Sequence, residues 1–434
     1  MGLTLDVEAC RRAIRDKNDA LRAVLTVLDE PVFDEDARRT GPLAGVPYVL
    51  KDTWDTAGVR TTGGSWRHRA RVPAESARPY KALLASGAVL LGKSNLCDLA
   101  FSAESDNHLF GPVRHPMDPT RTAGGSTGGG AAAVASGMAA FDWGTDFGGS
   151  IRMPAAHCGI VGLRLSSFAW PVEYDHFPRI SPHFWSFCGM GPLTRSVADA
   201  RRVVRALRSL RNDAAVVDVA RDHALLYAPD RAHRGDWPDF VRDATALLLR
   251  AAVRAEPAAM APPEDVRGLF ASYLASHFEE FIEGDELSLR EGIPAILMAL
   301  ASGGRLDRRV HPNTAILFAL LAAGRLVFRD KARANDALAA LRAQMASAWR
   351  RALVVAPATT ALPPRHGRAA LALRMGTFCQ LGNLTDATSI VIPFGSFAPS
   401  GLPRALQVLG PPGSEEAVLD LAERLERAAT LSSA

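Results

Sequence analysis

The sequence has 434 residues, of which 48% are hydrophobic and 22% are charged, and these proportions are typical of a folded globular protein with a large buried core. Its 50 Lys and Arg residues are nearly balanced by 46 Asp and Glu residues. A net charge of +4 on a chain of this length is too small to predict binding to nucleic acid or to an anionic membrane.

The N-terminal residues include acidic side chains and no apolar segment of signal-peptide length, and no apolar run approaches the ~18 residues of a membrane span. The five cysteines are dispersed, and neither C-x-x-C nor H-E-x-x-H occurs to indicate a metal site. We therefore expect a cytoplasmic protein that acts on a small molecule, with no metal, no cofactor and no membrane or nucleic-acid partner. The sequence does not predict its oligomeric state.

The first half of the chain alternates between helical and strand patterns. Apolar residues recur at helical spacing through the first 40 residues, and a short apolar run at 46–50 ends at Lys51 and Asp52. A helix is predicted from about residue 76, and the stretch GAVLLG at 87–92 reads as a buried strand. The small-residue stretch GGGAAAVASGMAAF predicts a closely packed helix, followed by a strand and a tight loop.

Beyond these elements, Ser196 and Asp199 open a helix as a variant of the capping box. Residues from about 230 to 350 are mainly Ala, Leu and Arg and predict helices. The stretches ALVVAPATT, SIVIPFG and PRALQVLG return to strand patterns, and a charged helix from Ser414 closes the chain. Strands in both halves with helices between them favour one continuous α/β domain.

A glycine-rich stretch, RTAGGSTGGGAAAVASG, runs from Arg121 to Gly137 and allows three interpretations. Its backbone N–H groups could hold a phosphate, its G-x-S-x-G segment around Ser126 matches a nucleophile elbow, or it could be a flexible loop. No lysine follows the glycines as in a P-loop, and no apolar strand precedes them as in a dinucleotide site or an elbow. The phosphate interpretation is the weakest of the three.

A second glycine-flanked serine, Ser150, lies 24 residues after Ser126 in the stretch GTDFGGSIRMPAAHCG. Glycines before a nucleophile leave main-chain N–H groups unshielded, as an oxyanion hole requires. If Ser150 is the nucleophile, the predicted donors to the oxyanion are the N–H groups of Phe147, Gly148, Gly149 and Ser150.

The base that would activate such a serine is either a histidine or Lys51. Eight histidines follow Ser126, so their presence alone does not discriminate. Lys51 ends the apolar run GVPYVLK, where burial would lower its pKa from the usual ~10.4 and allow it to take a proton from serine. The alternative for Lys51 is a structural ion pair with Asp52.

Together these stretches resemble the amidase signature family. Its glycine- and serine-rich region is matched by AGGSTGGGAAAVASGMAAFDWGTDFGGSIRMPAAHCGIVGLR and its lysine-bearing segment by GPLAGVPYVLKDTWDTAGVRTTGGS, with further landmarks in GPLTRSVADA and GLPRALQVLG. The resemblance covers nearly the whole chain apart from about 205–350. It implies a single α/β domain whose central mixed, twisted β-sheet is covered by helices on both faces. Its parts are an N-terminal helical segment (1–40), a catalytic core (41–205), a variable, mainly helical region (206–350) and a C-terminal return to the sheet with a final helix (351–434).

The family hydrolyses amides with a Ser–cis-Ser–Lys triad. By motif position, the resemblance implies that Ser150 is the nucleophile, that Ser126 is the bridging serine in a cis peptide, and that Lys51 is the general base. Asp146 and Arg152 match the supporting polar pair of the family, although a plain buried ion pair would fill nearly the same role.

The chain departs from the family pattern in two places. Thr127 stands where a second serine is often found, and Arg164, Leu165 and Ser166 replace the usual Lys-Pro-Thr. The segment that follows is longer and more aromatic than usual, and its aromatic side chains either line a substrate pocket or pack a loop against the core. The candidate pocket residues are Trp170, Tyr174, Phe177, Phe184, Trp185 and Phe187.

The resulting hypothesis is a serine hydrolase that cleaves a carboxamide, or a related aryl amide, carbamate (as in urethanases) or ester, through an acyl-enzyme. Two alternatives remain open at this point. The chain could be the A subunit of a tRNA-dependent amidotransferase, or a non-catalytic protein that keeps the fold. The same triad serves many substrates on this fold, so the substrate is not predicted.

Overall fold

The computed structural model describes residues 3, 5–171, 177–179, 181–212, 217–227, 237, 239–260, 263–282, 297, 301, 310–368 and 376–430. Within these ranges a single eleven-stranded sheet runs through the molecule, in the order β1-β3-β2-β4-β6-β5-β10-β11-β9-β7-β8. The strands are β1 (Val24–Val32), β2 (Pro47–Lys51), β3 (Val89–Ser94), β4 (Phe141–Asp146), β5 (Val161–Arg164), β6 (Gly189–Thr194), β7 (His223–Leu226), β8 (Arg254–Pro257), β9 (Leu353–Pro357), β10 (Thr388–Ser396) and β11 (Pro403–Gly410).

The sheet is mixed, as the sequence predicts. Strand β2 is parallel to both β3 and β4, and β7 is parallel to both β8 and β9. The remaining pairs, β1 with β3 and those from β4 through β6, β5, β10 and β11 to β9, are antiparallel. Pairing of β5 with β10 joins the first half of the chain to the second at the centre of the sheet.

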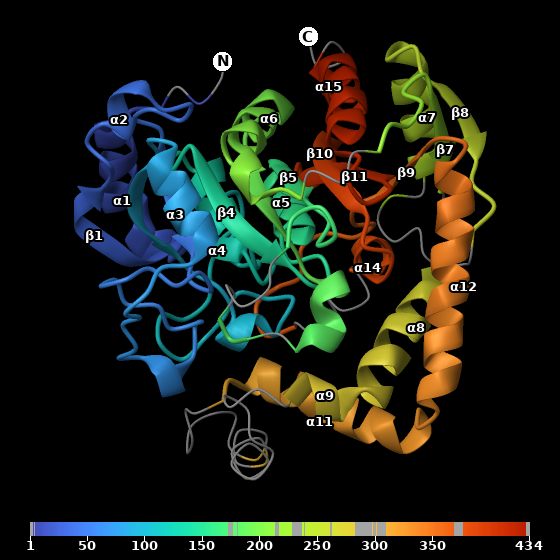
Figure 1. Ribbon diagram of the computed structural model, residues 1–434, viewed down its shortest axis with the longest axis horizontal. Coiled ribbons are helices and arrows are strands. Elements are labelled where there is room, and N and C mark those ends of the chain that lie inside the picture. The colour runs from blue at the N-terminus through green and yellow to red at the C-terminus, as the bar shows by residue number, and fades with distance from the viewer. Residues whose placement is uncertain are drawn as a thin grey trace.

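The helices lie on both faces of this sheet (Figure 1). They are α1 (Val7–Leu21), α2 (Ala37–Thr40), α3 (Arg78–Ala85), α4 (Gly128–Ala135), α5 (Arg152–Cys158), α6 (Val197–Ala206), α7 (Phe240–Arg250), α8 (Pro263–Ser276), α9 (Phe278–Ile282), α11 (Pro312–Val327), α12 (Lys331–Trp349), α14 (Thr377–Leu384) and α15 (Glu415–Thr430). The described residues also form the 3-10 helices η1 (Trp66–His68), η2 (Asp98–Ala100), η3 (Pro182–Phe187) and η4 (Arg208–Leu210).

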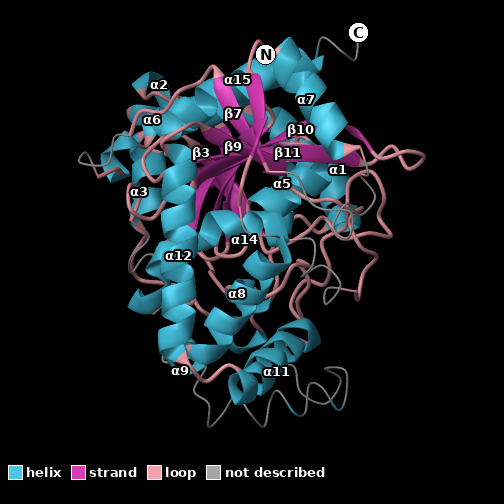
Figure 2. Ribbon diagram, turned by 90° about the vertical axis from the view of Figure 1, so that its right-hand side faces the viewer, coloured by secondary structure: helices cyan, strands magenta, loops and turns pink. Residues whose placement is uncertain are grey.

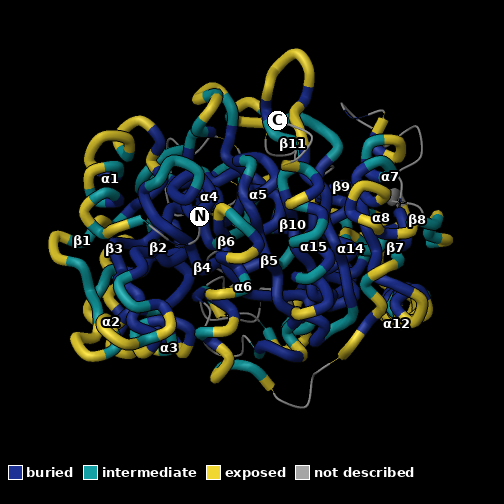
Figure 3. The backbone as a smooth tube through the Cα atoms, turned by 90° about the horizontal axis from the view of Figure 1, so that it is seen from above, coloured by how far each residue is buried: buried dark blue, intermediate teal, exposed yellow. Residues whose placement is uncertain are grey.

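Successive side chains of a strand point to opposite faces of the sheet, so the helices that each side chain contacts can be assigned to one face or the other. Tyr48 and Leu50 of β2 share a core with α3, α6, α7 and α15, whereas Val49 between them packs with α1, α4 and α5. A third apolar cluster joins α8, α11, α12 and α14 to β7 and β9. Helices α8, α9, α11 and α12 extend beyond one end of the sheet (Figure 2). The interior strands are buried and the exposed residues lie at the periphery (Figure 3).

The predicted elements largely coincide with the observed ones, and the main exceptions are strands at the two ends of the sheet. Residues 24–32 continue the helical apolar spacing in the sequence, but they form β1, which in the described part of the chain pairs with β3 alone. The variable region contributes β7 and β8 to the sheet in addition to its helices. The expected cap of α6 is present, since the Ser196 side chain accepts a hydrogen bond from the Asp199 N–H at 3.1 Å. Among the described residues, no helix combines the length and apolarity needed to span a membrane.

Candidate active site

Lys51, the last residue of β2, projects into a fully buried polar site. Its Nζ lies 2.7 Å from Oγ of Ser126, 2.9 Å from Oγ1 of Thr145 and 3.2 Å from the Thr145 carbonyl oxygen. Burial lowers the pKa of Lys51 to about 8, although buried carboxylates nearby oppose the shift. Lys51 is therefore much easier to deprotonate than a lysine in water.

The structural ion pair considered for Lys51 and Asp52 does not form. Asp52 instead lies 3.7 Å from Nζ of Lys93 and accepts hydrogen bonds from the N–H and hydroxyl of Thr62 at 2.8 and 2.7 Å. The carboxylate of Asp52 is thus engaged elsewhere, and the hydroxyls of Ser126 and Thr145 are the partners of Lys51.

Ser126 is held in place by a backbone that admits little besides glycine before it. The Gly125–Ser126 peptide bond is cis, as the family resemblance implies. A Cβ on Gly125 would lie 2.8 Å from the backbone at Ser102 and Ala103, so a larger residue would force the loop to move. Ser105 fixes the far side, since its hydroxyl donates to the Ser126 carbonyl at 3.0 Å and accepts from the Gly128 N–H at 2.9 Å.

Ser150 lies at the start of α5, in a loop joined to the Ser126 loop. The N–H of Thr127 donates to the Ser150 carbonyl oxygen at 3.1 Å, so the two glycine-rich segments are bonded directly. The Thr127 hydroxyl lies 3.4 Å from the Thr145 carbonyl oxygen, which also accepts from Lys51. Ser150 is half-buried, whereas Ser126 is 1% exposed, so Ser150 is the serine that a ligand can reach.

Asp146 organises the Ser150 loop. Its carboxylate accepts hydrogen bonds from the N–H groups of Gly149 and Ile151 at 2.9 and 3.1 Å, and from Nε and Nη2 of Arg152 at 3.0 and 2.9 Å. Burial by itself would raise the pKa of this carboxyl, but the Arg152 guanidinium holds it well below its usual range. Asp146 is therefore ionised at neutral pH, and its carboxylate shapes the turn.

The hydrogen bond to Asp146 engages one of the N–H groups that the sequence predicts as oxyanion donors. The N–H of Gly149 is already donated to that carboxylate, so Gly149 is not available as a donor to substrate in this conformation. The N–H groups of Gly148 and Ser150 donate no hydrogen bond within the described part of the chain. Of the four donors proposed from the sequence, these two are the ones that the geometry favours.

Two residues of the second half complete the support for the loop, and the sequence motifs did not indicate them. Asn383 accepts from Nη2 of Arg152 at 2.7 Å and donates to the Asp146 carboxylate at 2.8 Å. Gln407 accepts from Nη1 of Arg152 at 3.2 Å. The available signal is limited to Gln407, which is a polar residue within an apolar run, and such residues need partners when buried.

The aromatic residues proposed for a substrate pocket do not gather in one place. Trp170 lies in the core, where its indole N–H donates to Glu415 at 3.0 Å, because a buried indole requires an acceptor. Phe177 packs against Arg71, with the guanidinium 3.8 Å from the ring centroid. Tyr174 lies outside the described residues.

Two of these aromatic residues do approach the loop that carries Ser150. The ring centroids of Phe184 and Phe187 lie 6.0 and 6.1 Å from that of Phe147, next to the Ser150 turn. Phe270 of α8 packs on the other side, 6.3 Å from Phe147. The apolar wall of the site therefore combines η3 with α8, a helix of the variable region.

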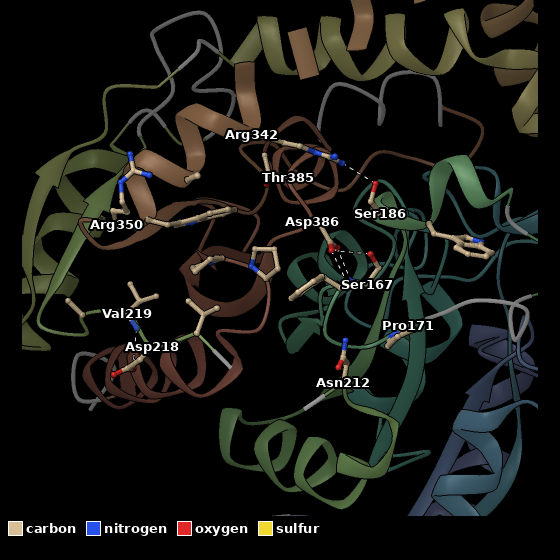
Figure 4. A pocket seen from close by; sticks show the side chains of 18 residues that line it. Ser167, Pro171, Ser186, Asn212, Asp218, Val219, Arg342, Arg350, Thr385 and Asp386 are labelled. Carbon is tan, nitrogen blue, oxygen red and sulfur yellow. Dashed lines mark hydrogen bonds between the residues drawn. The ribbon is translucent and has the colours of Figure 1, made fainter. Parts of the chain in front are cut away.

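Trp185 lines a separate cavity of about 1010 Å³ beside α12 (Figure 4). Its polar lining is largely occupied by contacts within the protein. Arg342 donates to the Ser186 hydroxyl at 3.0 Å, and Asp386 accepts from Arg164 and from the Ser167 hydroxyl, both at 3.0 Å. In the part of the chain that the structure describes, no group of three His, Cys, Asp or Glu side chains is arranged to hold a metal ion.

The family model described as Amidase matches residues 7–225. The A subunit of glutamyl-tRNA(Gln) amidotransferase from Anaeromyxobacter dehalogenans is 30% identical over 420 residues, covering 90% of this chain and 83% of that protein. The chain belongs to the amidase family, whose reaction is the hydrolysis of carbon–nitrogen bonds other than peptide bonds.

Other similarities agree with this membership. The corresponding protein of Moorella thermoacetica is 40% identical over 213 residues, and this match spans 46% of the present chain and less than half, 43%, of that protein's length. The structure of peptide amidase from Stenotrophomonas maltophilia superposes with a TM-score of 0.74 at 24% identity, covering 98% of this chain and 93% of the other. That likeness confirms the predicted α/β fold.

Proposed function

We propose that this protein hydrolyses a carboxamide through a covalent acyl-enzyme on Ser150. The observation that carries the proposal is the buried contact of 2.7 Å between Lys51 and Ser126, in a loop bonded directly to that of Ser150. At pH 7 a lysine with a pKa of about 8 is neutral in about one molecule in ten, and in that form it can accept a proton from a hydroxyl.

In the proposed reaction, neutral Lys51 accepts the hydroxyl proton of Ser126 while Ser126 accepts that of Ser150. The oxygen of Ser150 then attacks the substrate carbonyl carbon, and the negative charge on the carbonyl oxygen is stabilised by the N–H groups of Gly148 and Ser150. The proton returns through Ser126 to the nitrogen of the leaving group, and the carbon–nitrogen bond breaks. Water cleaves the resulting ester by the same relay in reverse.

The support for this relay lies in the rigidity of its surroundings. Asp146 and Arg152 are completely buried and tie the Ser150 turn to Asn383, so the nucleophile is positioned before substrate binds. Positioning of a reacting group in this way is a major source of rate enhancement. The glycine-rich stretches are thus assigned to a relay and an oxyanion site, rather than to phosphate binding.

A second candidate function is that of the A subunit of a tRNA-dependent amidotransferase, which is the name of the two sequence relatives described above. Such a chain would hydrolyse glutamine and would act with partner subunits. The experiment that separates the two measures hydrolysis by the purified chain alone of a panel of aliphatic amides, anilides, carbamates, esters and glutamine, by detecting the ammonia, amine, aniline or alcohol that each substrate releases.

The proposal predicts hydrolysis of simple amides by the isolated protein, with loss of at least about 10⁴-fold in Ser150→Ala. Glutaminase activity that appears only after partner subunits are added would favour the second candidate. A folded wild-type chain that hydrolyses none of the panel, with or without partners, would contradict both and favour a non-catalytic protein.

A further inference from the structure

The cavity beside α12 (Figure 4) is separate from the proposed relay, because none of Lys51, Ser126 and Ser150 lines it. Its volume of about 1010 Å³ is large enough for a small-molecule ligand. Phe168 is 56% exposed at this cavity, so the folded chain leaves one of its aromatic rings uncovered. Much of the lining consists of aromatic and proline side chains, namely Phe168, Pro171, Trp185, Trp349, Pro411 and Pro412. Walls of this kind are typical of sites that bind the apolar part of a ligand.

The two carboxylates that line the cavity are already engaged by other groups of the protein. Asp386 accepts from Nη2 of Arg164 at 3.0 Å, and from the N–H and hydroxyl of Ser167 at 2.8 and 3.0 Å. Asp218 pairs with Arg221 at 2.7 Å. Both carboxylates therefore have cationic partners of their own.

The two arginines that line the cavity have no such partners in the described part of the chain. Arg342 is half-buried and donates there only to uncharged groups, the Leu384 carbonyl oxygen at 2.8 Å and the Ser186 hydroxyl at 3.0 Å. Arg350 is exposed, and its side chain makes no hydrogen bond or ion pair with the same residues. Burial lowers the pKa of Arg342, and the charge of Asp386 opposes this only in part. A half-buried guanidinium without a carboxylate partner favours the binding of an anion.

We propose that this cavity binds an aromatic carboxylate, with the carboxylate on the Arg342 guanidinium and the ring against the aromatic and proline side chains. The planar guanidinium matches the geometry of a carboxylate, and the Ser186 hydroxyl, which accepts from Arg342, can donate its own proton to the same anion. Arg350 lies about two turns further along the chain from Arg342 and adds positive charge at the same cavity. The inference concerns a second binding site and does not depend on the proposed hydrolysis.

Equilibrium dialysis of the purified full chain tests the proposal with 2-naphthoate and with 2-acetylnaphthalene, an uncharged analogue of the same shape. The wild type is expected to bind 2-naphthoate with a dissociation constant below about 1 mM. It should bind the ketone at least about tenfold more weakly, because the ketone forms no charge-assisted hydrogen bond. Arg342→Gln should lose this preference for the carboxylate. Arg351→Gln, which removes a neighbouring arginine that pairs with Glu256, should retain it.

Phe168→Ala is the second variant, because the exposed ring of Phe168 contributes little to the folded core. It should weaken the binding of both naphthyl compounds by about threefold or more, since each loses the same apolar contact. If Arg342→Gln does not fold, the two ligands in the wild type and in Phe168→Ala decide the question.

Three results would overturn the inference. They are the absence of 2-naphthoate binding to the wild type at about 1 mM, equal affinity of the wild type for the two compounds, and unchanged binding in folded Arg342→Gln or in Phe168→Ala. The last result would place the ligand elsewhere, for example at the Ser150 turn. Because binding is measured without turnover, each result holds whether or not the chain hydrolyses amides.

Discussion

Lys51, in contact with Ser126, lies in a buried environment that destabilises its positively charged form. With a pKa near 8, the ammonium form dominates at neutral pH, and a proton acceptor must be in the neutral form. Both of the other hydrogen bonds of Lys51 within the described residues go to Thr145. Because Thr145 is not a base, it cannot take the proton of Lys51. The fraction of neutral Lys51 is therefore set by the pH of the solution.

The pH dependence follows from this requirement. Because the active form is neutral Lys51, kcat/KM should rise about tenfold per pH unit below pH 8 and level off above it. Lys51→Ala should lose at least about 10²-fold and should not show this alkaline rise. Initial rates of ammonia release between pH 6 and 10 measure both effects, and an activity that peaks at acid pH and survives Lys51→Ala would contradict the relay.

At the level of elements, the N-terminus of α5 is stabilised by a carboxylate rather than by the hydroxyl of a capping serine or threonine. Asp146, at the end of β4, accepts from the N–H groups of Ile151 and Arg152 at the beginning of α5, where an anion is favoured. The same carboxylate also pairs with the Arg152 side chain at 2.9 Å, and neither side chain is exposed. The turn that presents Ser150 therefore depends on one buried ion pair.

Asp146→Asn is expected to leave the Arg152 charge buried without an anion and to destabilise the protein by ~3–5 kcal/mol at pH 7. The pKa of Asp146 is lowered by folding, so its contribution to stability is complete above about pH 4 and is lost as the pH falls further. Urea unfolding at pH 7 and pH 3 tests this. A variant with wild-type stability at pH 7, or a difference that grows on acidification, would disagree with the assignment.

Strands and helices of this chain differ in how far they could be predicted. SIVIPFG and PRALQVLG are apolar runs bounded by proline or glycine, and they form the central strands β10 and β11. Strand β1 carries acidic residues and lies at the edge of the sheet, so its apolar residues repeat at a spacing that also fits a helix. Short strands such as β7 are stabilised by their neighbours in the sheet rather than by a pattern of their own.

The residues of the candidate site also differ in how far they could be predicted from the sequence. Lys51, Ser126 and Ser150 stand out in the sequence as candidates because glycine or a buried strand surrounds each of them, and the family resemblance predicts their roles. Asn383 and Gln407 could not, because their role arises only when α14 and β11 are folded against α5. The engagement of the Gly149 N–H by Asp146 is likewise a property of the folded turn.

In the whole molecule, the two halves of the chain form one structure. Strand β5 pairs with β10, and the buried Arg164 donates to Asp386 at 3.0 Å across the same junction. Residues 7–225, which match the family model, therefore do not include the strand that covers the open side of β5.

A chain truncated after residue 212 should consequently lack a cooperative unfolding transition. Strand β5 loses its partner β10, Arg164 loses Asp386, and Arg152 keeps Asp146 but loses its bonds to Asn383 and Gln407. Thermal unfolding of the truncated and the full chain, followed by circular dichroism, tests this prediction. A truncated protein with a sharp, reversible transition and amide hydrolysis would show that the first half is independent.

The identity of the nucleophile can be measured without knowing the substrate. A fluorophosphonate reacts covalently with an activated serine, and intact-mass and peptide mapping then locate the adduct. We predict one adduct per chain, on Ser150, abolished in Ser150→Ala and strongly slowed in Lys51→Ala. An adduct on Ser126, or labelling that persists in Ser150→Ala, would contradict the assignment of Ser150 as the nucleophile.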